Sequence, residues 1–176
     1  MLPMTHNLNS RAFDTPVWIE NVSRDDCRNG RHTDMGTKSV LIQITDPATF
    51  FPVPKHQFAQ VHQFEFMDAE DDDNFPDECK FSDEQASEIV GILQNALANR
   101  MNVLVHCHAG ICRSGAVVEV GSIMGFTPTE RFRLPNIRVK HRMMRVLGLT
   151  YDSDEESMPI GCDISSGGII IPLGDV

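Results

Sequence analysis

Short apolar stretches alternate with amphipathic and polar ones along most of this chain. Apolar, β-branched segments bounded by Gly, Pro or charged residues predict strands at 16–22, 39–44, 61–67 and 101–105. Apolar residues at helical spacing predict a helix at 82–99, and small and apolar residues predict another at 114–124. Because strand, helix and strand follow one another, the two strands should be parallel. The predicted fold class is α/β, with a central, mainly parallel sheet flanked by helices.

Capping and turn residues set the expected ends of these elements. Ser82 and Gln85 form a capping box that begins the first helix, and Gly125 is placed to end the second. Residues 127–130 carry a further capping pattern, from which we expect another helix to start. Residues 25–36 are dense in charge, Gly and Asn, and are predicted to form a loop.

Composition divides the chain into one folded unit and two flanking segments. A length of 176 residues suits one domain with a sizeable core, which we place at 14–149. Residues 1–13 are polar and irregular and are expected to form a flexible lead-in. Residues 150–176 are expected to form an acidic C-terminal tail, in which the apolar residues 169–171 are a candidate edge strand.

Charge, hydropathy and cysteine content narrow the functional classes. The formal net charge of −10 disfavours binding to nucleic acids or anionic membranes. No apolar run is long enough to span a membrane, and the N-terminus lacks the pattern of a signal peptide. Five cysteines, an odd number without regular spacing, fit a reducing compartment. We therefore expect a cytoplasmic protein without a membrane partner, and the sequence gives no indication of its oligomeric state.

The stretch with the most chemical content is 103–115, where an apolar run stops at Cys107 and resumes as a predicted helix. Five residues separate Cys107 from Arg113, so the connecting loop can point several backbone N–H groups at one spot beside the helix N-terminus. Such a spot suits a phosphate group. A guanidinium that grips two phosphate oxygens and a sulfur that faces the phosphorus would complete a phosphoryl-transfer site in which Cys107 attacks.

These residues resemble the cysteine-dependent protein phosphatases, whose signature is His-Cys, five residues, and Arg followed by Ser or Thr. His106, Cys107, Arg113 and Ser114 match that signature, and Ala109-Gly110 matches the loop of the dual-specificity branch. The resemblance implies that 14–149 is a phosphatase domain that hydrolyses phosphotyrosine in proteins through a phosphocysteine, and it leaves open whether phosphoserine and phosphothreonine are substrates as well. It implies neither a metal nor another cofactor. The implied phosphate-binding residues are His108, Ala109, Gly110, Ile111, Cys112 and Arg113.

Roles for three residues of the motif follow. The helix N-terminus, the converging N–H groups and Arg113 all favour the thiolate form of Cys107. By the resemblance, Ser114 donates a hydrogen bond to the sulfur and eases its departure when water attacks the intermediate. His106 is expected to sit beneath the loop and to fix it by hydrogen bonding.

The resembled family also uses an aspartic acid, in a loop after a sheet strand, to protonate the leaving oxygen. Asp68 directly follows the third predicted strand and is our candidate for this general acid. It lies 39 residues before Cys107 (107 − 68), so the assignment requires an insertion relative to the family, for which 74–80 is the candidate. Otherwise the acidic segment 68–78 is expected to be solvated. The rival acids are Asp71, Asp72, Asp73 and Asp77, of which Asp77 fits the family's usual spacing better.

Two other functions remain open on the same scaffold. One is a 5′-RNA triphosphatase, and the other is a pseudophosphatase, a module that binds phosphoproteins without turnover. Basic residues gather at 131–145; most such charges are solvated faces of helices, although the cluster can attract an acidic phosphoprotein. The expected partner is a phosphorylated protein substrate, and a nucleic acid is disfavoured.

Overall fold

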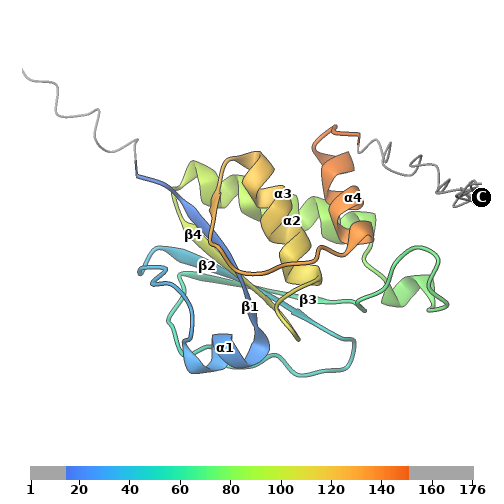
Figure 1. Cartoon of the computed structure of the whole chain (residues 1–176), viewed down its shortest axis with the longest axis horizontal. Helices are drawn as coiled ribbons and strands as arrows, with labels where there is room; N and C mark the ends of the chain where they lie inside the picture. The colour runs from blue at the N-terminus through green and yellow to red at the C-terminus, as the bar shows by residue number, and fades with distance from the viewer. Residues whose placement is uncertain (1–14, 151–176) are drawn as a thin grey trace, which may run out of the picture.

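The computed structural model describes residues 15–150, in which a five-stranded sheet carries helices on both faces (Figure 1). The strands are β1 (Trp18–Ser23), β2 (Ser39–Thr45), β3 (Gln60–Glu65), β4 (Asn102–Cys107) and β5 (Thr127–Pro128). They lie in the order β3-β2-β4-β1-β5, and every neighbouring pair is parallel. The predicted α/β class is therefore confirmed. The lead-in predicted at 1–13, the tail beyond Thr150 and its candidate edge strand lie outside the described residues.

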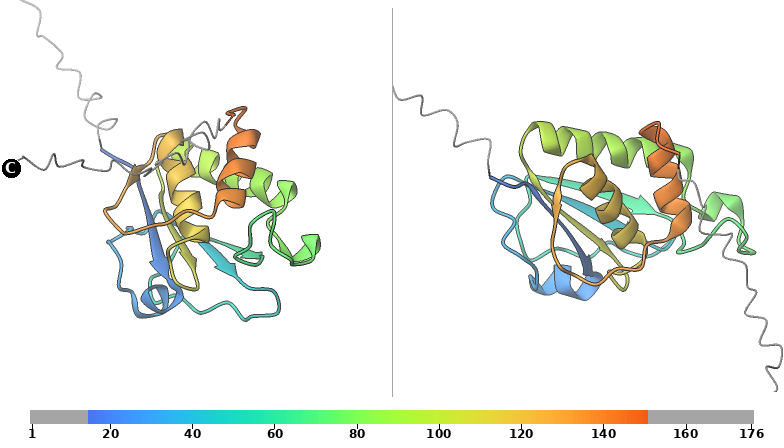
Figure 2. Two further views of the ribbon diagram at one scale, coloured as in Figure 1. Left: turned by 45° about the vertical axis from the view of Figure 1, so that its right-hand side comes forward. Right: turned by 45° about the horizontal axis from the view of Figure 1, so that its top comes forward.

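Helices cover the two faces of the sheet unequally. Three of them, α2 (Asp83–Ala98), α3 (Arg113–Met124) and α4 (Ile137–Val146), lie on one face, whereas the short α1 (Arg24–Asn29) lies on the other (Figures 1 and 2). A single 3₁₀ turn, η1 (Asp77–Cys79), interrupts the acidic segment. Since β4 is the central strand and α3 follows it, the loop between them emerges from the middle of the sheet's carboxyl edge.

Alternation along the strands explains the two apolar layers of the core. Ile19 and Val103 point to the face under α2, α3 and α4, where most of the buried apolar side chains gather. Val22 and Leu104 point to the opposite face, where they join a smaller cluster with Cys27 of α1. The small residues of α3 allow the helix to pack closely on the sheet, because a Cβ added at Gly121 would lie 2.6 Å from Cδ1 of Ile19.

The predicted caps are confirmed on α2 and α3. The Ser82 hydroxyl accepts a hydrogen bond from the Gln85 N–H at 3.1 Å, and the Gln85 side chain accepts one from the Ser82 N–H at 3.1 Å. Gly125 ends α3, and its N–H donates to the carbonyls of Gly121 and Ser122. These ends are decided by residues within one turn, which is why the local sequence predicts them.

The loop predicted at 25–36 is wrong at its start, because residues 24–29 form α1. Ser23 caps this helix through a hydrogen bond from the Asp26 N–H at 3.1 Å. Asp25 and Asp26 lie in its first turn, where carboxylates interact well with the helix dipole. Gly30 ends it at a φ of +67°.

The helix predicted to start at 127–130 is also wrong. These residues instead extend the sheet as β5, with the Thr127 N–H donating to Val17 O at 2.8 Å and the Thr129 N–H to Ile19 O at 3.1 Å. This pairing provides donors for carbonyl groups along the edge of β1, which would have no hydrogen-bond partner there if residues 127–130 formed a helix. The next helix, α4, begins at Ile137 with Asn136 as its N-cap.

Most of the basic cluster binds acidic residues of the same chain. Arg131 pairs with Glu20 at 2.6 Å, and Lys140 pairs with Glu119 at 2.8 Å. Arg142 pairs with Asp83 at 2.7 Å. The cluster is therefore largely neutralised and is not a free cationic surface.

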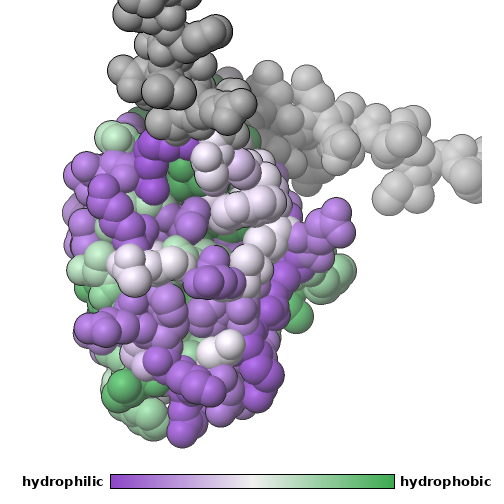
Figure 3. All heavy atoms as spheres, turned by 90° about the vertical axis from the view of Figure 1, so that its left-hand side faces the viewer, coloured by the Kyte–Doolittle hydropathy of each residue, from purple (hydrophilic) through white to green (hydrophobic). Residues whose placement is uncertain are grey.

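The exterior carries no sign of a membrane-spanning element in the part of the chain that the structure describes. None of the helices between residues 15 and 150 is both long and apolar enough to cross a bilayer. Figure 3 shows one face of the molecule, which is mostly hydrophilic with small scattered apolar patches.

Candidate active site

Cys107 is the last residue of β4 and is 2% exposed. Its sulfur accepts a hydrogen bond from the Gly110 N–H at 3.2 Å and lies 3.2 Å from the hydroxyl oxygen of Ser114. Ser114 is in the first turn of α3, so the sulfur sits at the N-terminal end of that helix. The loop N–H of Gly110 and the hydroxyl of Ser114 thus meet at the position where the motif places the nucleophile, beside the N-terminal end of a helix.

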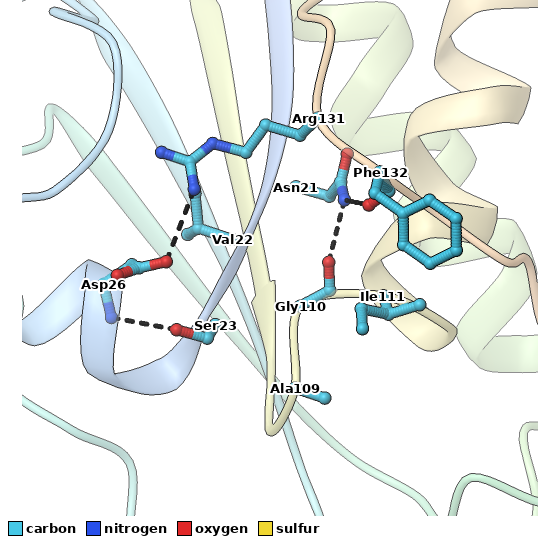
Figure 4. Close-up of a pocket in the computed structure, with 9 residues that line it drawn as sticks. All are labelled: Asn21, Val22, Ser23, Asp26, Ala109, Gly110, Ile111, Arg131 and Phe132. Carbon is cyan, nitrogen blue, oxygen red and sulfur yellow. Dashed lines mark hydrogen bonds and ion pairs between the residues drawn. The ribbon is translucent and has the colours of Figure 1, made fainter.

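The loop that carries the predicted phosphate-binding residues has an inner and an outer side. At Gly110 the N–H points inward to the Cys107 sulfur, while the carbonyl points outward and accepts a hydrogen bond from Asn21 Nδ2 at 2.8 Å (Figure 4). Gly110 has a φ of +75°, and a Cβ there would lie 2.2 Å from the backbone carbon of Val22. Only glycine permits this loop to lie so close to β1.

Arg113 is fixed at the opposite end of the loop and is 3% exposed. Its Nη1 donates to Asp46 Oδ1 at 2.8 Å and to the carbonyl oxygen of Phe66 at 2.7 Å. Its Nε is buried and has no hydrogen-bond partner among residues 15–150. The guanidinium is therefore held in place through one nitrogen while a second donor remains available.

Asp46 is a site residue that the sequence reasoning missed. Its carboxylate directly follows β2, the neighbour of β4 in the sheet. The carboxyl ends of parallel strands share one edge, so an acid after β2 reaches the loop after β4. That rule could have identified Asp46 once the strand order was known.

Asp68 is the candidate acid that lies against the loop. Its Oδ1 accepts a hydrogen bond from Asn136 Nδ2 at 2.9 Å, and its side chain also hydrogen-bonds with that of Cys112. Cys112 in turn lies close enough to Cys107 for their charges to interact. Asp68 and the Cys107 sulfur therefore flank the same loop residue.

The rival acids are engaged elsewhere or point to solvent. Asp71 forms an ion pair with Arg138, and Asp73 Oδ2 accepts a hydrogen bond from the Glu70 N–H at 2.7 Å. Asp77 is 90% exposed and lies 3.9 Å from Lys80, and Asp72 is exposed. The expectation that the segment is solvated is confirmed for residues 71–78, all of which are exposed, although Asp71 and Asp73 also make these contacts.

Asn136 ties three parts of the site together and was also missed as a site residue. Its N–H donates to the Cys112 carbonyl at 3.1 Å, its Oδ1 accepts from the Val139 N–H at 3.0 Å, and its Nδ2 donates to Asp68 and to the Ala69 carbonyl. The side chain is 4% exposed. The backbone N–H and the side-chain amide of this one residue thereby join the end of the phosphate loop, the acid and the start of α4.

The two cysteines of the loop differ in their chemistry. Burial raises the pKa of Cys112, and the neighbouring Asp68 carboxylate raises it further. Cys112 therefore stays a neutral thiol at neutral pH and serves as a hydrogen-bond donor. Cys107, with the helix N-terminus and two donors at its sulfur, is the better-placed nucleophile.

His106 lies completely buried beneath the loop, as expected, but it does not fix the loop through a strong hydrogen bond. Neither ring nitrogen has a hydrogen-bond partner of normal geometry between residues 15 and 150. The nearby Cys107 backbone acts to raise the pKa of the ring, but this effect is outweighed. Burial lowers the pKa of His106 to about 4, and the nearby charges of Arg24 and Arg113 lower it as well. The ring is therefore neutral at physiological pH.

Metal binding receives no support from the side chains that the structure describes. Between residues 15 and 150, no group of three or more His, Cys, Asp or Glu side chains is arranged to hold a metal ion. The polar groups around Cys107 are instead hydrogen-bond donors and one guanidinium, which suit an anion.

Comparison with known proteins gives matches of fold. No protein-family model and no curated protein matches the chain. The human tyrosine phosphatase-like serine/threonine/tyrosine-interacting protein matches 73% of this chain over 89% of its own, with 14% identity and a TM-score of 0.45. The OH1 tyrosine phosphatase of the Orf virus matches 59% of this chain over 53% of its own, with 22% identity and a TM-score of 0.39.

A third solved structure, a mouse putative dual specificity phosphatase, matches 62% of this chain over 70% of its own, with 13% identity and a TM-score of 0.40. These similar structures are tyrosine and dual-specificity phosphatases or phosphatase-like proteins, the group that the motif from His106 to Ser114 resembles. Every one of these TM-scores is below 0.5, so the function below rests on the residues of the site.

Proposed function

We propose that this protein is a cysteine-dependent phosphatase that hydrolyses phosphotyrosine, and also phosphoserine and phosphothreonine, in proteins. The observation that carries the proposal is the buried Nε of Arg113, which has no hydrogen-bond partner among the described residues. A buried donor on a charged group is costly unless something accepts from it. A phosphate oxygen is the acceptor that fits, because the other end of the same loop holds a cysteine sulfur surrounded by donors.

The proposed first step is an in-line displacement at phosphorus. The Cys107 thiolate attacks, so that a sulfur–phosphorus bond forms as the bond to the substrate oxygen breaks. Arg113 and the loop N–H groups bind the remaining phosphate oxygens, whose charge is spread over three atoms in the transition state. Asp68 gives its proton to the departing oxygen, which leaves as a neutral phenol or alcohol.

In the second step water attacks the phosphocysteine and releases inorganic phosphate. Asp68, now a carboxylate, accepts a proton from that water. The thiolate leaves, and the hydroxyl of Ser114 stabilises it by a hydrogen bond across the 3.2 Å that separates the two atoms. The enzyme returns to its starting state with no metal or other cofactor in either step.

The test is Cys107→Ser, assayed on a phosphotyrosine peptide and a small aryl phosphate in the presence of a metal chelator. We expect the wild-type chain to hydrolyse both and the variant to lose roughly 10⁴-fold or more in kcat, because an alcohol is a far poorer nucleophile. The variant should still bind the peptide, since the donors stay in place. Arg113→Ala should lose both binding and turnover.

Cys79→Ser is the matched control, because Cys79 lies in η1 and contributes no side chain to the loop. It should leave both activities unchanged. Hydrolysis retained in Cys107→Ser would remove Cys107 as the nucleophile and the mechanism with it. Peptide binding without any turnover in the wild type would indicate a pseudophosphatase, and phosphate release from RNA 5′ ends alone would indicate an RNA triphosphatase.

A further inference from the structure

A hollow of about 380 Å³ adjoins the outer side of the phosphate loop (Figure 4). Ala109, Ile111 and Phe132 line one side of it, and Ser23, Asp26 and Arg131 lie across from them or at its end. The volume is at the lower end of the roughly 300–1,000 Å³ found for small-molecule pockets, which leaves room for one or two side chains. The hollow shares Ala109, Gly110 and Ile111 with the phosphate loop, but its lining does not include Cys107.

Phe132 is displayed into solvent from a backbone that is firmly anchored. Its ring is 74% exposed, while its carbonyl accepts a hydrogen bond from Asn21 Nδ2 at 3.0 Å. The next residue, Arg133, donates to Asn21 Oδ1 at 3.0 Å, and the Leu134 N–H donates to the Ile111 carbonyl at 3.3 Å. An exposed aromatic ring gains little from folding, so its placement beside the loop by an anchored backbone points to recognition.

The polar side of the hollow is already neutralised. Asp26 binds Arg31 at 2.8 Å and Arg131 at 3.3 Å, and Arg131 also binds Glu20 at 2.6 Å. Two carboxylates and two guanidiniums thus satisfy one another. A charged ligand group would have to compete with these pairs, whereas an apolar group would bury part of Phe132 and Ile111 without that cost.

We propose that this hollow is a substrate subsite, which takes an apolar side chain within two positions of the phosphorylated residue. The proposal rests on the phosphatase function proposed above. An extended peptide advances about 3.3 Å per residue. When the phosphorylated side chain of the substrate is bound on the inner side of the loop, a substrate residue one or two positions away can therefore reach the hollow on the outer side. At Gly110 the loop packs directly on the backbone of β1. The inner side of the loop, which faces the sulfur, and its outer side, which faces the hollow, therefore lie close together.

The experiment uses phosphotyrosine peptides that differ at one position at a time, with Leu, Gly, Asp or Lys at each of the two positions before and after the phosphotyrosine. At one position or more, Leu should raise kcat/KM roughly tenfold over Gly, as expected for partial burial of one apolar side chain. Asp and Lys should resemble Gly. In Phe132→Ala this preference should fall to within about twofold, while hydrolysis of a small aryl phosphate stays unchanged.

Leu134→Ala is the matched control, because Leu134 is also exposed, at 65%, and lies on the same segment but does not line the hollow. It should keep the full preference. Peptide binding to Cys107→Ser chains with and without Phe132→Ala measures the same preference without turnover. Two results would overturn the subsite and leave the phosphatase function standing. In one, the chain hydrolyses the small aryl phosphate but the peptides show no preference for Leu; in the other, the preference for Leu is the same in Phe132→Ala as in the wild type. A Leu preference in binding, in a chain that hydrolyses nothing, would retain the subsite and overturn the phosphatase function.

Discussion

The phosphate loop and the acidic segment meet at one edge of the sheet, yet contacts of very different range shape them. In the loop, the Cys107 sulfur is bound by Gly110 and Ser114, three and seven residues away. In the acidic segment, Asp68 is bound by Asn136, which is 68 residues away. Burial differs as well, since Cys107 and Arg113 are 2% and 3% exposed whereas Asp68 is exposed.

The phosphate loop, residues 107–113, is therefore a rigid cradle for the phosphate, whereas Asp68 is a proton donor whose position can adjust. The cradle is built from backbone groups whose directions are fixed by the strand before it and the helix after it. The acid depends on the start of α4 to hold its carboxylate against the loop. Changes in the cradle should therefore abolish the reaction, whereas changes around Asp68 should slow it by an amount that depends on the leaving group.

The largest expected effect outside the cradle is that of Asp68→Asn. Hydrolysis of phosphotyrosine should slow by roughly the 10²–10⁴-fold that general acid catalysis supplies, because the phenolate leaves poorly without a proton. An activated aryl phosphate, whose leaving group needs no proton, should lose much less. Steady-state kinetics on the two substrates measure both numbers.

Single Asn variants of the four rival acids provide the controls for Asp68. Asp72 and Asp77 are exposed, and Asp71 and Asp73 make contacts away from the loop, so each of these variants should stay near the wild-type rate. A large loss that depends on the leaving group at any of them, with Asp68→Asn near wild type, would transfer the general acid role to that residue.

A smaller, graded effect is expected from Asn136, which positions Asp68. Asn136→Ser keeps a good N-cap for α4 but removes the Nδ2 donor. Losing the hydrogen bond that orients the protonated carboxyl costs about 0.5–1.5 kcal/mol, so phosphotyrosine hydrolysis should slow by roughly two- to tenfold. The activated aryl phosphate should again be less affected, which a general loss of structure would not explain.

A double-mutant cycle shows whether Asn136 acts through Asp68. In the Asp68→Asn chain, adding Asn136→Ser should cost almost nothing further in kcat, because the group that it positions can no longer donate its proton. Thermal unfolding of each variant checks that α4 is intact. Fully additive losses would mean that Asn136 supports the fold and does not position the acid.

The sequence predicted the parts of this molecule that depend on neighbouring residues. The strand that ends at Cys107, the helix that begins after it and the capping box of α2 all depend on residues within a few positions of one another. The loop motif belongs to the same class, since its hydrogen bonds join residues from 107 to 114. Local chemistry was sufficient for these features.

The parts that could not be predicted depend on the order of strands and on distant partners. Thr127 and Thr129 carry a helix-capping pattern, but the open edge of β1 binds their N–H groups, and no local property of the sequence reveals that edge. Asp46 lies 67 residues from Arg113, and its role follows only when β2 is known to neighbour β4. Asn136 lies 68 residues from Asp68, so the hydrogen bond between their side chains is visible only in the tertiary structure.

The last expected effect lies beneath the phosphate loop, at His106, and it concerns stability instead of the reaction rate. The pKa of this ring is lowered to about 4, chiefly by burial, whereas in the unfolded chain a histidine titrates near its ordinary value of 6.5. Between these two values the unfolded chain binds more protons than the folded one. Stability is therefore full above about pH 6.5 and is lost as the pH falls toward 4, by an amount on the order of 3 kcal/mol.

The comparison that isolates this effect is the wild type against His106→Gln, in urea titrations between pH 7 and pH 4. Carboxylates elsewhere titrate in both chains and cancel in the difference, so the wild type should lose about 3 kcal/mol more of its free energy of unfolding than the variant does. Unfolding free energies that fall in parallel would mean that the buried ring keeps an ordinary pKa. A steeper loss in the wild type would instead mean that the phosphate loop rests on a ring that must stay neutral, because a proton there would face the charges of Arg24 and Arg113 without water to screen them.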